Sequence, residues 1–507
     1  MAGTRRLTLL IVLLGAGGAW ADDPTGAVTI RWIHPDRQVE QVLALFQGAR
    51  APHPAAALSA WRCATRDAGS LGKPIEGLIA LFNPEMVREF RSLDEAKVGI
   101  GIDPATGQIR WYAVAPNDDG TFASVATALV LTEGGAAPPF EGIGVDRLGP
   151  DGAALLARVP GVLTLVGSRE DLPEAIRQAG ADVLARPDVD SGLCFHLDPR
   201  RLATTGSVPL RRIVEAVRGL ELSDVEGLFA LRGDAVALTL SSRFEKDQAT
   251  GGTLDPAWLE WLPAEGVQAT FAVALDSKPE SWDAAFAWAD RIDRADPARA
   301  QVAPLRTRLN LLAITAGVRL EVDLWPKLRG VSGYSLSDAE GRVVGGLLAL
   351  HLVDEGSAQR LATEVLPRAV NRLSRGKPKE APPASLPDGA QWLGTVSERP
   401  LSVLLRGSTL LVGWGETTLS AALAAKARPE HSAAVLLKGA PCKTTPRRAA
   451  AFWPGGLGSS KLSDAPPVVW WGWDEKGMTH DVVRWEGLHG VVVRYLERLP
   501  LQPPTDH

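Results

Sequence analysis

The sequence has too few cysteines and too little positive charge for several common kinds of protein. Only three cysteines occur among 507 residues, which excludes a disulfide framework and a zinc site with four thiolates. Lys and Arg number 54 against 59 Asp and Glu, for a formal net charge of -5. A basic nucleic-acid-binding surface is therefore not indicated, and we expect no nucleic-acid partner.

Long apolar runs are also missing. Beyond residue 18 there is no stretch of about 18 uninterrupted apolar residues, so no later segment is predicted to span a membrane. Hydrophobic residues make up 45% of the chain and charged residues 22%, as in ordinary globular proteins. A chain of this length is expected to form about two to four domains.

The N-terminus has the pattern of a secretory signal peptide over residues 1–21. Arg5 and Arg6 precede an apolar stretch from Leu7 to Gly18, and Ala19-Trp20-Ala21 is a small-x-small cleavage site. The apolar stretch is about a dozen residues, short of the roughly 20 that cross a bilayer. We expect cleavage between Ala21 and Asp22, export to the periplasm or the extracellular space, and no transmembrane anchor in the mature chain.

Export would place the three cysteines in an oxidising space. Cys63 and Cys194 lie in the same half of the chain and are the candidate pair, with Cys442 left as a free thiol. The alternative, which we favour, is that all three are small buried apolar residues.

The most informative feature is internal repetition, which indicates a duplicated architecture. Four segments recur in the same order at an offset of about 240 residues. The matched pairs are Asp103–Gly107 with Ser337–Gly341, Val166-Gly167 with Val412-Gly413, Arg243-Phe244-Glu245 with Arg484-Trp485-Glu486, and Trp258–Pro263 with Tyr495–Pro500. We interpret them as a tandem duplication, with a first repeat over residues 22–263 and a second over residues 264–507.

Short apolar or alternating runs within each repeat predict strands joined by tight turns. Residues 227–231 and 235–240 flank Gly233-Asp234, a two-residue hairpin signal. Strands joined this closely must be antiparallel. The predicted fold class is α+β, with two tandem similar units, each an antiparallel sheet with helices packed on one face. The C-terminal apolar stripe from Leu488 to Leu499 is expected to dock on its own sheet.

No pattern assigns a catalytic or cofactor-binding site. Phosphate loops, nucleotide-binding glycine patterns, helical zinc-protease motifs and nucleophile elbows are missing from the sequence. Ser70-x-x-Lys73 and Ser374-x-x-Lys377 match the short serine–lysine pattern of penicillin-binding enzymes, but neither has the partner motifs of that site. We therefore predict no catalytic residue and no cofactor.

Metal ligands are not predicted either. Asp182, Asp188 and Asp190 could offer oxygens to calcium, but the rest of a calcium loop is missing, so we expect a solvated turn. His34 and His196 stand beside strand-like segments, where a partly buried imidazole with a hydrogen-bond partner is the ordinary interpretation.

Tryptophan is unusually frequent, with 16 Trp against 3 Tyr and 11 Phe. In Trp470-Trp471-Gly472-Trp473, strand alternation places Trp471 and Trp473 on one face and Trp470 on the other. An exposed pair could stack on sugar rings, which makes Trp471 and Trp473 the ligand-stacking candidates. We favour the alternative that they fill the layer between sheet and helices.

The stretch Pro304–Leu312, followed by Glu321–Pro326, resembles a group of uncharacterised exported bacterial proteins assigned to domains of unknown function. The resemblance covers both halves of the chain, the second better than the first. It implies an exported envelope protein and transfers no functional residue.

The sequence therefore predicts a non-catalytic cell-envelope protein that serves as a binding or structural module, with another envelope protein or a polysaccharide as partner. One alternative is an envelope hydrolase or carbohydrate-binding enzyme, which would need two carboxylates roughly 5–10 Å apart beside Trp471 and Trp473. Another is a lipid-binding or chaperone-like shell, which would need a large continuous apolar cavity.

Overall fold

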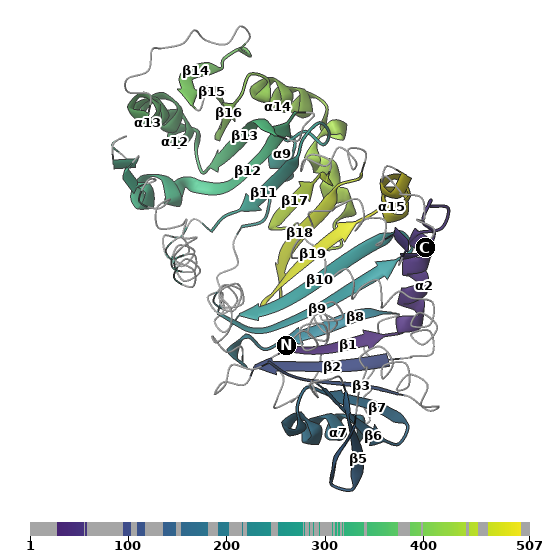
Figure 1. Ribbon diagram of the computed structural model, residues 1–507. Helices are drawn as coiled ribbons and strands as arrows, with labels where there is room; N and C mark the ends of the chain where they lie inside the picture. Colours follow the sequence, from purple (N-terminus) through teal and green to yellow (C-terminus); the bar gives the residue numbers. More distant parts are fainter. Residues whose placement is uncertain are drawn as a thin grey trace. The chain divides into compact units, whose positions relative to one another are not determined.

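The computed structural model describes most of the predicted strands and several of the helices. The described residues are 28–54, 56–57, 95–102, 109–116, 135–148, 154–180, 191–201, 215, 221–244, 252–276, 319–338, 342–373, 386–396, 399–442, 446–454 and 465–497, with single positions and short pairs between 278 and 317. They form nineteen strands in a mixed α+β fold, and the strand registers run antiparallel within each unit described below (Figure 1).

The chain divides into two compact units. Among the described residues, unit 1 holds those within Met1–Ser207, Leu222–Arg243 and Glu486–His507, and unit 2 holds those within Val208–Glu221 and Phe244–Trp485. The sequence boundary at residue 263 does not coincide with this division. The end of the predicted first repeat lies in unit 2, and the C-terminal helix lies in unit 1.

Unit 1 contains ten strands and three α-helices in its described part. These elements are β1 (Val28–Ile33), α2 (Pro35–Leu45), β2 (Glu95–Ile102), β3 (Ile109–Pro116), β4 (Ala136–Phe140), β5 (Ile143–Leu148), β6 (Ala154–Val159), β7 (Val162–Val166), α7 (Leu172–Gly180), β8 (Gly192–Leu197), β9 (Leu222–Arg232), β10 (Ala235–Phe244) and α15 (Leu488–Glu497), with short 3₁₀ turns η2 (Arg169–Asp171) and η3 (Pro199–Arg201). The last residue of β10, Phe244, is already counted with unit 2.

In the sheet of unit 1, the first strand in the sequence, β1, lies in the middle. The strands are hydrogen-bonded side by side in the order β10, β9, β8, β1, β2, β3, β7, β6, β5 and β4. Helix α7 packs over β3 and β7, where Leu172 and Ala175 are fully buried with Tyr112, Val114 and Val166. The predicted hairpin is confirmed: β9 and β10 are joined through Gly233, whose φ of 60° suits a residue without a side chain.

Unit 2 contains nine strands and four α-helices in its described part. These elements are α9 (Pro256–Leu259), β11 (Ala269–Ala274), β12 (Leu328–Ser337), β13 (Val343–Leu352), α12 (Glu355–Arg360), α13 (Leu366–Leu373), β14 (Gln391–Val396), β15 (Arg399–Arg406), β16 (Thr409–Trp414), α14 (Thr418–Ala427), β17 (Arg448–Phe452), β18 (Val468–Glu475) and β19 (Met478–Trp485), with short helical turns η5 (Leu320–Leu324), η6 (Trp325–Lys327), η7 (Leu361–Val365), η8 (Pro429–His431) and η9 (Ala433–Gly439).

In the sheet of unit 2, the first strand in the sequence, β11, also lies in the middle. The strands are hydrogen-bonded side by side in the order β19, β18, β17, β11, β12, β13, β16, β15 and β14. The main core lies between this sheet and α9 and α14, where Leu259, Leu262, Leu404 and Leu411 are fully buried. The two-residue connections predicted to give antiparallel strands recur here between β18 and β19.

Helices cover both faces of the unit 2 sheet, so the expectation of one covered face is wrong for this unit. Leu411 of β16 packs with Leu419 of α14. Its neighbour Leu410 points to the opposite face and packs with Ala358 of α12 and with Leu361. The physical reason can be read in β16 itself: Leu410, Leu411 and Val412 form a continuous apolar run, as expected for a strand buried on both faces.

The C-terminal stripe forms α15, which belongs to unit 1 rather than to the unit that holds most of the predicted second repeat, so the expected docking on its own sheet is wrong. Its Leu496 is 4% exposed and packs with Ala49, Ala51 and Ala57, which follow α2 in unit 1. An amphipathic stripe predicts that one face is buried, but it does not specify the surface that covers it. Within the described part of the chain, none of the helices combines the length and apolarity needed to cross a bilayer.

Candidate functional site

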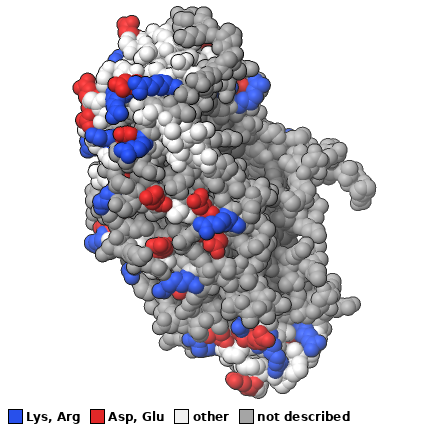
Figure 2. All heavy atoms as spheres, turned by 90° about the vertical axis from the view of Figure 1, so that its left-hand side faces the viewer, with Lys and Arg blue, Asp and Glu red and all other residues white. Residues whose placement is uncertain are grey.

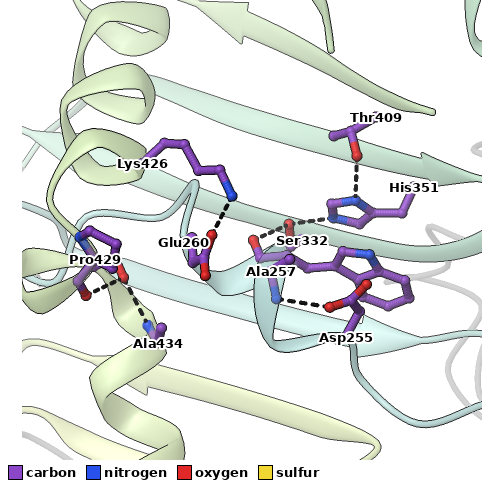
Figure 3. A network of polar contacts seen from close by, with 11 residues as sticks. Asp255, Ala257, Glu260, Ser332, His351, Thr409, Lys426, Pro429 and Ala434 are labelled. Carbon is purple, nitrogen blue, oxygen red and sulfur yellow. Dashed lines mark hydrogen bonds and ion pairs between the residues drawn. The ribbon is translucent and has the colours of Figure 1, made fainter. Parts of the chain in front are cut away.

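A buried polar network on the inner face of the unit 2 sheet is the best-formed group of chemically versatile side chains in the described residues. Ser332, His351 and Thr409 come from β12, β13 and β16, which are adjacent strands. The Ser332 Oγ lies 2.8 Å from His351 Nε2, and Thr409 Oγ1 lies 3.2 Å from His351 Nδ1 (Figure 3). The three side chains therefore form a continuous chain across the sheet.

Helix α9 covers this network. Asp255 begins the helix by accepting a hydrogen bond from the Ala257 N–H at 2.9 Å, and Pro256 occupies the first turn. The Trp258 indole then stacks on the His351 ring with centroids 4.4 Å apart and an interplanar angle of 7°. Gly330 makes room for the indole, because a Cβ there would lie 2.2 Å from Trp258 Cζ3.

The hydrogen bonds are compatible with a neutral His351 that carries its proton on Nε2. The Ser332 hydroxyl donates to the Trp258 carbonyl oxygen at 3.4 Å, so the Ser332 oxygen is free to accept from His351 Nε2–H. The Nδ1 atom then accepts from the Thr409 hydroxyl. Both ring nitrogens are satisfied in the neutral imidazole, and burial lowers the pKa of His351 from 6.5 to about 3.

This geometry favours a structural role for the network. A serine hydroxyl within hydrogen-bond reach of a histidine is the first requirement of a nucleophile and its base. Here, however, Ser332 is 0% exposed and His351 is 2% exposed. In addition, His351 Nδ1 bonds the Thr409 hydroxyl. A catalytic histidine would instead need a carboxylate at this nitrogen to stabilise its charged form. The network therefore joins three strands through side-chain contacts beneath α9.

Two further contacts hold the segment after α9 in place. Glu260 forms an ion pair with Lys426 of α14 (Figure 3), and the same ammonium lies 5.2 Å from the centre of the Trp261 ring. The Ser432 hydroxyl donates to the Pro429 carbonyl at 2.7 Å and accepts from the Ala434 N–H at 3.3 Å. Pro263 pairs with Ser432 in an isolated β-bridge, so this polar turn is joined directly to the end of the α9 segment.

The ligand-stacking candidates Trp471 and Trp473 lie in the core. They are 4% and 9% exposed and belong to the cluster beneath α9 and α14, and Trp473 stacks on His480 at 5.3 Å. Trp470, on the other face of β18, donates from Nε1 to Asp481 at 2.8 Å. Burial supports the interpretation that Trp471 and Trp473 fill the layer between sheet and helices.

Several other predicted residues lie in unit 1. His34 is the residue before α2 and has a φ of 47°. His196 contacts the Asp224 carboxylate on the neighbouring strand. Burial raises the pKa of the Cys194 thiol to about 11, although the nearby Arg31 acts in the opposite direction. Cys194 and Cys442 form no disulfide among the described residues.

The remaining candidates fall outside the described residues. They are Ala19 and Ala21 of the cleavage site, Cys63, the Ser70/Lys73 and Ser374/Lys377 pairs, and Asp182, Asp188 and Asp190. The described residues contain no group of three or more His, Cys, Asp or Glu side chains that could hold a metal ion. On the face shown in Figure 2, described basic and acidic groups are interspersed rather than gathered by sign.

The network centred on His351 was missed by sequence reasoning. His351 stands in an apolar strand sequence, Leu350-His351-Leu352, and nothing in that pattern distinguishes it from a surface residue. Its partners are 19 and 58 residues away in the sequence. The available signal was Asp255-Pro256, which has the form of a helix start and would have placed Trp258 on a helix.

Comparisons with known proteins give no family for this chain. No protein-family model and no curated protein matches the sequence. Among solved structures, crystal forms III, IV and I of a protein named TP0453 show a distant resemblance, with TM-scores of 0.26, 0.23 and 0.24 and sequence identities of 7%, 6% and 9%. The matches cover 45%, 43% and 45% of this chain and 82%, 76% and 81% of TP0453. A resemblance at these scores carries no argument about function.

Proposed function

We propose that this chain is an exported, non-catalytic cell-envelope protein that acts as a binding or structural module. The observation that carries the proposal is the ordered signal-peptide pattern of Arg5-Arg6, the apolar stretch and Ala19-Trp20-Ala21. The burial of the His351 network supports the non-catalytic part of the proposal, because its polar groups form hydrogen bonds with one another beneath Trp258. The partner is another envelope protein or a polysaccharide.

We also propose that the two units derive from one duplicated α+β unit. Support comes from the strand orders, because β9-β8-β1-β2-β3-β7-β6-β5 and β18-β17-β11-β12-β13-β16-β15-β14 connect their strands in the same sequence order. A row of cross-strand partners can also be followed through four strands in each unit. Arg31, Lys97, Val114 and Thr164 are cross-strand partners in unit 1, and Ala272, Ser332, Ala349 and Leu411 are the partners in the same strand order in unit 2.

Cell fractionation with N-terminal sequencing tests the export proposal. The full chain, produced in a bacterium with a C-terminal tag, is expected outside the cytoplasm with Asp22 as its first residue. Ala21→Leu is expected to block processing, because the cleavage site requires a small residue at this position. The matched control Trp20→Leu changes the unconstrained middle position and should be processed normally. A cytoplasmic chain that retains Met1 would contradict the proposal.

Binding and turnover assays distinguish the module from the enzyme alternative. Cross-linking of the exported chain in intact envelopes is expected to capture one partner protein, or a polysaccharide panel to retain the chain. The same panel should show no hydrolysis. Turnover of any envelope polysaccharide by the purified chain would instead support the hydrolase.

A further inference from the structure

Each repeat ends with a helix that packs in the unit formed mainly by the other repeat. In the first repeat, β10 is followed by α9, and the Trp258–Pro263 segment covers the end of this helix and the turn after it. In the second repeat, β19 is followed by α15, which contains the matching Tyr495-Leu496-Glu497. The helix encoded by the first repeat lies in unit 2, and the helix encoded by the second repeat lies in unit 1.

The helix from the first repeat completes the unit 2 core. Leu259 and Leu262 are 0% exposed and pack in the cluster with Ala272, Leu347 and Trp471. The main chain is bonded on both sides of the helix, because the Leu254 N–H donates to Pro446 at 3.0 Å and the Ala433 N–H donates to Leu262 at 2.7 Å. Burial of this kind makes the segment an integral part of unit 2.

The helix from the second repeat is held in unit 1 by contacts of the same kinds. The Leu488 N–H donates to Asp234 at 2.8 Å, at the turn between β9 and β10. The His489 Nδ1 atom lies 3.1 Å from the Leu45 carbonyl at the end of α2. Leu496 is buried among three alanines whose small side chains let the helix approach closely. The docking surfaces of the two helices differ, but both are contributed by the other repeat.

We infer that the two repeats exchange their C-terminal helices, so that each repeat carries a docking surface for the helix of the other. The inference rests on the proposed duplication. In physical terms, each repeat alone would leave apolar surface uncovered where the exchanged helix packs. The other repeat of the same chain is therefore the partner that each docking surface fits, and tandem fusion supplies it.

A nick between the repeats tests the exchange in the full chain. A protease site placed at Glu265-Gly266 lies in an exposed turn, where Gly266 has a φ of 69°. After cleavage, α9 stays on the N-terminal fragment and α15 on the C-terminal fragment. The two fragments are expected to elute together in size-exclusion chromatography, because each contains a helix that completes the other's core.

Weakening each exchanged helix should weaken this association. Leu259→Ala and Leu496→Ala are each expected to raise the dissociation constant of the nicked fragments about thirtyfold, as expected for the loss of a buried leucine side chain. Leu348→Ala is the matched control, because Leu348 is 41% exposed on β13, and it should leave the dissociation constant unchanged. Equal association of all variants would overturn the exchange.

Hydrogen exchange of the uncut chain gives an independent readout. Leu259→Ala is expected to increase exchange in β11 and β12 of unit 2, and Leu496→Ala in α2 of unit 1. The reverse pattern would overturn the inference. Failure of the proposed duplication would give a different result. In an experimental structure, β1–β3 and β7 would not superimpose on β11–β13 and β16, and this outcome does not depend on where α9 and α15 pack.

Discussion

The sheet face beneath α7 in unit 1 and the sheet face beneath α14 in unit 2 are built from the same strand order but from different chemistry. The unit 2 face is mainly apolar, with Ala272, Ala349 and Leu411 all 0% exposed, although it also buries the His351 network, Thr270 and the Tyr334 hydroxyl, which donates to the Thr418 carbonyl. The unit 1 face has charged residues in the corresponding strands: Arg31 is 4% exposed and Lys97 is 8% exposed. Both faces are nonetheless covered by a helix.

Buried charges in unit 1 are paired with partners on the sheet and on the helix. Arg31 Nε donates to Glu95 Oε1 at 2.7 Å. Lys97 donates to Gln178 of α7, whose amide donates to Glu174 at 2.6 Å. Buried ion pairs contribute little net stability, because desolvation offsets most of their attraction, but the loss of one partner costs a great deal. One strand order therefore tolerates either an apolar or a charged face, provided that every buried charge keeps its partner.

Removing one partner of the buried ion pair should have the largest effect. Glu95→Ala would leave the Arg31 guanidinium buried without its carboxylate, and we expect a loss of about 3–5 kcal/mol from the free energy of unfolding of unit 1. Native-state hydrogen exchange of β1 and β2 in increasing denaturant measures this loss. The hydrogen-exchange rates of peptides from unit 2 should not change.

Two further variants sharpen that test. The double substitution Arg31→Met with Glu95→Leu makes the unit 1 face resemble that of unit 2 and should recover most of the lost stability. Glu170→Ala removes an exposed carboxylate from the same unit and should change stability by less than about 0.5 kcal/mol. If Glu95→Ala costs no more than this control, the Arg31 charge does not depend on Glu95.

A pH titration should reveal the polar network of unit 2. The folded pKa of His351 is about 3 and its ordinary value is 6.5, so between these values the unfolded chain binds a proton that the folded chain does not. Unit 2 therefore loses stability as the pH falls through this window, by about 2 kcal/mol between pH 7 and pH 5. Denaturant unfolding monitored by hydrogen exchange of β12 and β13 measures the slope.

The His351→Leu variant isolates that slope. Because leucine does not titrate, the pH-dependent loss assigned to His351 should disappear in this variant. His196→Leu in unit 1 is the matched control and should leave the slope of unit 2 unchanged. If the stability of unit 2 still falls with pH to the same extent in His351→Leu, another titrating group is responsible for the effect.

The local elements were predictable from sequence because their signals are local. The Gly233-Asp234 turn predicted the hairpin, and alternation placed Trp471 and Trp473 on one face of β18. The candidate network was not predictable in this way. Ser332, His351 and Thr409 become neighbours only through the pairing of β13 with β12 and β16. The surface buried by α15 is likewise chosen by tertiary packing rather than by its own apolar stripe.

The smallest expected effect concerns a single hydroxyl in the unit 1 face. Thr164 is 0% exposed and its Oγ1 atom has no hydrogen-bond partner within the described structure, whereas Leu411 on the unit 2 face beneath α14 is apolar. Thr164→Val keeps the shape and removes the unsatisfied hydroxyl, so unit 1 should gain about 1 kcal/mol in free energy of unfolding. Thr363→Val is the control, because the Thr363 hydroxyl donates to Gln359 at 2.9 Å, and it should bring no gain. A loss of stability in Thr164→Val would show that this hydroxyl is bonded in solution, and the contrast between a polar and an apolar face would then extend to β7.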